Sequence, residues 1–318
     1  MQYEMTSDGL GVNMKPSEPF QAVISADYTS NRLVGRKTIQ WHINNKRLDF
    51  EKGNQIKEDL IAFLNNGGEG IDLTFDEANM IFGIAYLFTK YEYPQYLECT
   101  DGQLFTAMKY KKNLSGWQRQ RLRGTLERLS KKKFPMYWTE GKFRIPWMTF
   151  DTLFNLESSF QTGNGVSGNQ DDHESSKRNL YRISLNKILF GRLSNNFRML
   201  DPFIGRKIRD YRKALAQRPT EYDLRLYDLL LQENKRIVRW NYLKIAQAPM
   251  LMDKYIRQRK IKYIRDKLND LYRMYCDLGY LLDFKIEQPG TKNTVDILYI
   301  NPDKFYKLRQ GKGKSDGI

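Results

Sequence analysis

The first half of the chain alternates between strand-like and helix-like spacing of its apolar residues. Thr74 and Glu77 have the spacing of a capping box before the apolar run 78–91, which predicts a helix. The stretches 101–110 and 115–134 are predicted as two further helices, and residues 134–147 as two aromatic-rich strands around a turn. Further predicted elements lie upstream: strands at 21–28 and 37–43, and a short helix at 54–66.

The second half repeats this order with a different sequence. Two strands are predicted at 181–190 and 195–200 and a helix at 202–217, and Thr220 and Asp223 form a second capping box before a helix at 224–235. A short helix at 240–249 precedes a long basic helix at 253–278, which Gly279 is suited to end. Two strands around a Pro-Gly turn follow at 280–301.

Helix, short helix, basic helix and hairpin therefore occur twice, which is the order of a winged helix-turn-helix domain. The predicted fold class is α+β, mainly helical, with two tandem winged helix-turn-helix domains. Residues 157–179 are rich in Ser, Gly, Asn and Asp and show no apolar period, which predicts a flexible linker. This linker would divide an N-terminal domain (1–156) from a C-terminal domain (180–310), and residues 311–318 would form a disordered basic tail.

The basic stretch 115–133 separates its side chains into two faces. At 100° per residue, one stripe expected to face the core holds Gln118, Leu122, Thr125, Leu126 and Leu129. The opposite face holds Trp117, Gln120, Arg121, Gly124, Arg128 and Lys131. Arginine and glutamine are the residue types that contact guanine and adenine edges in a major groove, and lysine suits phosphates. The candidate DNA-binding residues here are Gln120, Arg121, Arg128 and Lys131.

The predicted helix 253–278 has the same two-faced arrangement. Its apolar seam is Ile261, Ile264, Leu268, Leu271, Tyr275 and Leu278, and its outward face provides the candidates Tyr255, Gln258, Arg259 and Lys262. A single basic helix is usually a solvated face, but two with equal net charge favour a recognition surface. A membrane-surface or calmodulin-target helix is the alternative, yet the outward faces carry isolated aromatics rather than an apolar stripe. In the predicted hairpins, Arg144, Lys285 and Lys292 are candidate contacts to DNA backbone or minor groove, or simple surface charges.

Charge supports a polyanionic partner. The chain has 53 Lys and Arg against 37 Asp and Glu, a net charge of +16, which indicates nucleic acid first and an anionic membrane surface second. Residues 1–156 contribute +3 and residues 157–318 contribute +13, so the C-terminal half is expected to dominate DNA binding. The two cysteines lie far apart and suggest neither a disulfide framework nor a zinc site. Without a signal-peptide pattern or a long apolar run, we expect a soluble protein of the bacterial cytoplasm with no membrane partner.

Catalytic chemistry finds little support in the sequence. The only histidines are His42 and His173, which are neither paired, as a metal-dependent nickase requires, nor near the C-terminal basic region, as a tyrosine recombinase requires. No phosphate-binding GxxxxGK[ST] loop follows a predicted strand. We therefore expect a protein that is not an enzyme and that has no cofactor and no metal site.

A family resemblance rests on residues 225–284, where a helix ending in a Lys/Arg-rich turn leads to a short helix and then to a long one. In that last helix Leu268, Leu271 and Leu278 precede Gly279 and Tyr280. This pattern, with the doubled order of elements, resembles plasmid replication initiator (Rep) proteins of the iteron-binding, two-winged-helix type. The resemblance implies that the C-terminal domain is the main reader of repeated origin sites, and that the N-terminal one touches DNA more weakly or mediates a homodimer. It also implies melting of a neighbouring AT-rich segment and recruitment of host initiator and helicase proteins.

The predicted function is a sequence-specific, double-stranded-DNA-binding initiator of plasmid-type replication. Two alternatives use the same modules. One is a winged-helix transcriptional regulator, which the sequence does not separate from an initiator. The other is a protein-interaction scaffold in chromosome maintenance, which predicts no DNA affinity at physiological salt.

Overall fold

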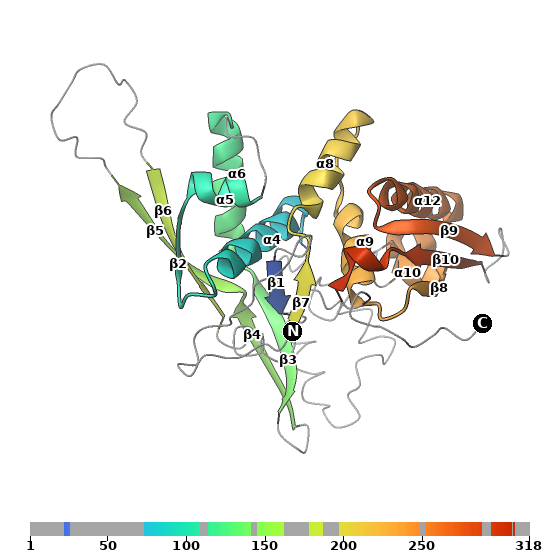
Figure 1. The fold of residues 1–318 in the computed structure, drawn as a ribbon, viewed down its shortest axis with the longest axis horizontal. Helices are drawn as coiled ribbons and strands as arrows, with labels where there is room; N and C mark the ends of the chain where they lie inside the picture. The colour runs from blue at the N-terminus through green and yellow to red at the C-terminus, as the bar shows by residue number, and fades with distance from the viewer. Residues whose placement is uncertain are drawn as a thin grey trace.

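A computed structural model describes most of the chain from residue 73 onward. The described residues are 22–25, 73–108, 114–140, 145–161, 178–186, 197–247, 252–287, 294–306 and 308. The fold is mixed α+β and mostly helical, with small antiparallel sheets (Figure 1). Several predictions lie outside the described residues: the strand 37–43, the helix 54–66, the tail 311–318, and His42 and His173.

The first half contains three of the predicted helices: α4 (Phe75–Lys90), α5 (Asp101–Ala107) and α6 (Gly116–Lys131). The capping box before α4 is confirmed, because the Thr74 and Glu77 side chains each accept a hydrogen bond from the other residue's backbone N–H. Ser115 and Gln118 form the same box at α6. Local sequence signals therefore set these helix starts.

The predicted hairpin at 134–147 is confirmed as β3 (Lys133–Glu140) paired with β4 (Ile145–Thr152). It forms a two-stranded sheet of its own and projects away from the helices (Figure 1). The strand that precedes α5, β2 (Leu97–Thr100), belongs instead to a sheet with strand order β2-β6-β5. The partner strands are β5 (Phe154–Gln161) and β6 (Arg178–Leu185).

This pairing corrects the interpretation of residues 157–179 at both ends. Residues 157–161 belong to β5 and residues 178–179 to β6, and these two strands pair antiparallel with Gln161 opposite Arg178. The ends of the predicted linker therefore lie side by side in one sheet. The prediction also placed β6 in the second domain, whereas it lies between β2 and β5. Residues 162–177 lie outside the described residues, and the division into two independent domains stays a prediction.

The second half begins with β7 (Phe197–Leu200), which pairs with β1 (Ala22–Ser25) from near the start of the chain. The helices α8 (Ile204–Ala214) and α9 (Glu221–Gln232) follow, and the Thr220–Asp223 capping box is confirmed. The remaining elements are β8 (Ile237–Asn241), α10 (Tyr242–Gln247), α11 (Asp253–Arg257), α12 (Ile261–Asp277), β9 (Leu281–Glu287), β10 (Val295–Ile300) and the 3-10 turn η1 (Pro302–Lys304). The last three strands form a sheet with the order β8-β10-β9, and the predicted second hairpin is thus confirmed.

The single long helix predicted over 253–278 is wrong. It is two helices, α11 and α12, separated by residues 258–260, with Arg259 in the left-handed region at φ 54°. The Arg259 N–H donates to the Ile256 carbonyl (2.9 Å) and the Lys260 N–H to the Tyr255 carbonyl (2.8 Å), which is the hydrogen-bond pattern of a Schellman helix end. No glycine or proline marks this break in the sequence.

The two halves share one hydrophobic core. Figure 1 shows α8 and α9 between the α4–α6 helices on one side and α12 with its sheet on the other. Phe82 of α4 meets Tyr227 of α9 with ring centroids 6.2 Å apart, and Tyr86 of α4 meets Phe203 before α8 at 5.2 Å. Helices α4 and α8 also approach each other at Gly205, where a Cβ atom would lie 2.0 Å from Asn79 Oδ1.

Replacing Gly205 with alanine is therefore expected to cost about 1–3 kcal/mol of unfolding free energy, because the added methyl overlaps the buried Asn79 amide. Gly124→Ala is the matched control. A Cβ at Gly124 would meet only the end of Arg128 at 3.4 Å, and we expect a gain of up to about 1 kcal/mol in helix stability. Urea unfolding measures both variants. Equal effects would contradict the close α4–α8 packing, whereas rescue of Gly205→Ala by Asn79→Ala would support it.

Candidate nucleic-acid interface

The apolar stripe predicted for α6 packs into the core. Leu122, Leu126 and Leu129 are buried, as is Thr125, whereas Gln118 is exposed and serves the N-terminal cap. Trp117 on the opposite face is 67% exposed. The predicted orientation of this helix is therefore confirmed.

Two cations of α6, and Lys132 immediately after it, form ion pairs with the starts of two other helices. Arg121 pairs with Asp76 at 2.5 Å, and Lys132 pairs with Glu77 at 2.7 Å. Arg123 pairs with Asp101 in the first turn of α5, with Nε donating at 2.7 Å. The three acids lie at helix N-termini, where the helix dipole also favours a negative charge. The three cations are therefore already neutralised within the protein.

The other candidates on α6 have few internal partners. Arg128 donates to the Thr125 hydroxyl at 3.1 Å and its side chain is exposed. Gln120 and Lys131 are exposed and form no hydrogen bond or ion pair through their side chains with another described residue. The face that carries Gln120, Arg128 and Lys131 is thus open, while Arg121 already neutralises an acid and lies 5.7 Å from the centre of the Trp117 ring.

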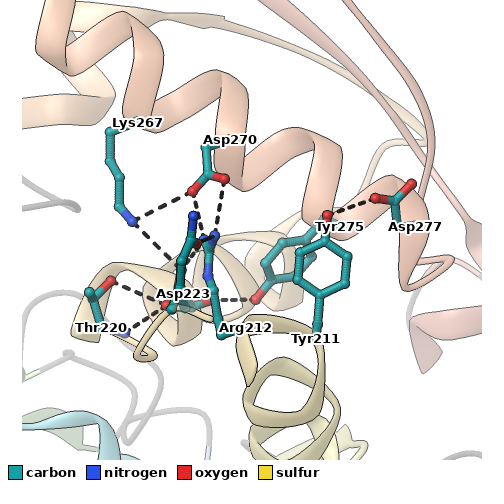
Figure 2. Close-up of polar contacts among 9 residues, drawn as sticks. Tyr211, Arg212, Thr220, Asp223, Lys267, Asp270, Tyr275 and Asp277 are labelled. Atoms are coloured by element: carbon teal, nitrogen blue, oxygen red, sulfur yellow. Dashed lines mark hydrogen bonds and ion pairs between the residues drawn. The ribbon is translucent and has the colours of Figure 1, made fainter. Parts of the chain in front are cut away.

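A buried ion-pair cluster holds α12 against α8 and α9 (Figure 2). Arg212 of α8 is 1% exposed, and its Nη2 lies 2.6 Å from Asp223 Oδ1 on α9 and 2.8 Å from Asp270 Oδ2 on α12. Tyr275 of α12 donates to the Asp223 carbonyl at 2.5 Å. Burial alone would raise the pKa of Asp270, but the hydrogen bonds and charge of Arg212, assisted by Lys267, hold that pKa below its usual value.

A second cluster holds α12 against the sheet. Asp296 on β10 is fully buried and accepts from Arg265 (2.7 Å) and from the Tyr272 hydroxyl (2.8 Å), both on α12. Burial raises the pKa of Asp296, and Arg265 and Tyr272 offset part of that rise. The Arg265 guanidinium also lies 4.9 Å from the centre of the Tyr242 ring at the start of α10. Two of the basic residues of α12, Arg265 and Lys267, therefore orient the helix.

The cations around the start of α12 have a different environment. Every residue from 257 to 263 is exposed: Arg257, Gln258, Arg259, Lys260, Ile261, Lys262 and Tyr263. None of the four cations forms an ion pair with another described residue, and the stretch contains no acid. We call residues 257–263 the basic turn.

The basic turn is held at both of its ends. The two Schellman hydrogen bonds hold its first end. The ring centroids of Tyr255 and Tyr263 lie 4.3 Å apart across the turn, and Ile264, immediately after it, is fully buried. Its charges are therefore presented from a fixed backbone rather than from a mobile loop.

The structure brings Tyr255, Gln258, Arg259 and Lys262 together in or beside the basic turn, although the continuous helix used to choose them is not present. Arg257 and Lys260 were missed, because their angular positions on a continuous helix lie away from the predicted outward face. The density of basic residues in the sequence was the signal that could have found them. Ile261, predicted in the apolar seam, is 36% exposed.

The predicted hairpin residues lie apart from the basic turn in the sequence and are described only in part. Lys285 on β9 is exposed, with Nζ 5.5 Å from the centre of the Tyr299 ring. Arg144 and Lys292 lie outside the described residues.

Within the described ranges, no group of three or more His, Cys, Asp or Glu side chains is arranged to hold a metal ion. In the same ranges, no helix is both long enough and apolar enough to cross a membrane.

Comparison with known proteins finds similarity to solved structures. No protein-family model matches the chain, and no curated protein matches it. The chain is similar to the crystal structure of domains 2 and 3 of RctB, with a TM-score of 0.39 and 16% identity over 71% of this chain and 82% of that chain. The selenomethionine derivative of RctB domains 2 and 3 gives a TM-score of 0.43 and 13% identity over the same shares of the two chains.

Proposed function

We propose that this protein is a sequence-specific, double-stranded-DNA-binding replication initiator that recognises repeated origin sites. The observation that carries DNA binding is the basic turn, with four exposed cations that no described acid neutralises. The initiator role rests on the resemblance of the sequence to iteron-binding initiators.

We also propose that the C-terminal part is a winged helix-turn-helix domain. Its elements run α9, β8, α10, α11, α12, β9, β10, and the strand order β8-β10-β9 places the last strand between the other two. In this assignment α12 is the helix presented to the major groove, and the β9–β10 hairpin is the wing. Lys285 would then lie on the wing.

The same assignment fits the N-terminal part once its sheet is taken into account. The order α4, β2, α5, α6, β5, β6 with strand order β2-β6-β5 matches the C-terminal arrangement strand for strand. The wing would be β5–β6, and the β3–β4 hairpin would be an insertion after α6. Because two α6 cations and Lys132 just after the helix pair with Asp76, Asp101 and Glu77, we assign the weaker DNA contact to this domain.

Duplex binding is expected to weaken steeply with salt, because each neutralised phosphate releases condensed counterions. For about eight phosphate contacts, the slope of log K against log salt concentration would be about −7. Fluorescence anisotropy with a random duplex, followed by selection of bound sequences, measures affinity and preference together. An absence of affinity at physiological salt would support a protein-interaction scaffold instead.

Initiator and regulator are separated by a replication assay. A replicon that carries the selected repeats should fail to propagate without this protein. Propagation without it, with altered transcription beside the repeats, would favour the regulator.

A further inference from the structure

The basic turn contains one residue whose backbone conformation sets it apart. Arg259 has φ 54°, a left-handed conformation that an arginine adopts only at a cost in free energy. The same helix-end motif closes α12, where Gly279 occupies the equivalent position at φ 76° with matching hydrogen bonds from residues 279 and 280. Glycine thus fills this position at one helix end, and arginine fills it at the other.

The backbone of Arg259 has more contacts than that of an ordinary surface arginine. Its N–H is hydrogen-bonded to Ile256, the next N–H is bonded to Tyr255, and the Tyr255–Tyr263 ring contact closes the turn around it. Its side chain is exposed and forms no ion pair with another described residue. Arg257, Lys260 and Lys262 surround it and supply positive charge without a left-handed backbone.

We infer that Arg259 reads a guanine in the major groove, as the specificity-determining residue of the basic turn. This inference rests on the proposed DNA-binding function. A phosphate contact needs only a nearby cation, which three neighbours already provide, whereas a base contact needs a donor fork held in a defined direction. The planar guanidinium can donate two parallel hydrogen bonds to guanine O6 and N7, and the hydrogen-bonded turn sets the direction in which the side chain leaves the backbone.

The inference is tested with Arg259→Lys and Arg259→Gly. Lysine keeps the charge but not the bidentate fork, so affinity for random duplex should stay within about twofold while preference for guanine at one position falls about 10- to 100-fold. Glycine suits the left-handed backbone, so it should lose the same preference with unfolding stability unchanged or raised. Lys213→Ala, which removes an exposed cation from α8, is the control and should change neither quantity.

A modified base provides a second measurement. Substituting 7-deazaguanine for that guanine removes the N7 acceptor, and it should weaken binding of the natural protein but not of Arg259→Lys. The inference is overturned if Arg259→Lys keeps the full guanine preference, if Arg259→Gly weakens all duplexes equally, or if the selected site contains no guanine. Failure of the unaltered protein to bind any duplex would instead overturn the proposed function, and this inference with it.

Discussion

Replacing Arg212 with methionine is expected to lower the free energy of unfolding by about 3–5 kcal/mol. The change leaves two carboxylates without their main cation, and one of them, Asp223, is fully buried. Methionine fills a similar volume, so the loss would come mainly from unpaired charge rather than from a cavity. Urea unfolding at neutral pH measures the difference.

The matched control lies on the same helix. Arg206 forms an exposed pair with Asp210 at 3.1 Å, and Arg206→Met should cost less than about 1 kcal/mol, as surface pairs usually do. Similar losses in the two variants would show that the Arg212 cluster does not hold α8, α9 and α12 together.

Acid pH should act on the same cluster. The folded-state pKa of Asp270 is lowered, so its contribution to folding stability is fully present above its unfolded pKa, near 4. That contribution is lost as the pH falls through the lower folded-state pKa. In Arg212→Met that pKa is no longer held down by the guanidinium, so this part of the acid dependence of stability should shrink.

The second large effect concerns DNA. Replacing Arg257, Lys260 and Lys262 together with alanine should weaken duplex binding about 100-fold at about 0.15 M salt, because each released counterion contributes roughly fivefold there. The slope against log salt should change by about three, from about −7 to about −4. All three residues are exposed and none is paired with another described side chain, so unfolding stability should be nearly unchanged.

A triple substitution of equal charge in and just after α6 tests the division of labour between the two halves. Arg119, Lys131 and Lys133 are also exposed, and their replacement with alanine should weaken binding less than the triple substitution in the basic turn does. The same order is expected for single substitutions: replacing Arg259 or Lys262 should weaken duplex binding more than replacing Arg121 or Arg128. The reverse ranking would overturn the assignment of the C-terminal domain as the main reader.

Predictions that depend on local signals succeed in this chain. The predicted capping boxes at Thr74 and Thr220 place helix starts correctly, since a cap is made by residues three positions apart. The two hairpins, β3–β4 and β9–β10, are likewise contained in short stretches of alternating residues. The outward face of α6 follows from its apolar period alone.

Features that depend on distant partners could not be predicted. The alternation of residues in β6 does not indicate that β2 is its neighbour, so this strand, which follows a polar stretch, was predicted in the second half. The pairing of Arg121 with Asp76 joins residues 45 positions apart. The break between α11 and α12 has arginine rather than glycine at its left-handed position. Because the helical period of apolar residues also continues across it, the sequence gives no signal of the break.

The central place of β6 has a practical consequence for making this protein in pieces. An expression fragment that stops at residue 156 would retain β2 without β6, and a fragment that begins at residue 180 would carry most of β6 without either neighbour. Unpaired strand edges promote aggregation, so neither fragment is a sound unit for crystallisation or for domain-by-domain assays.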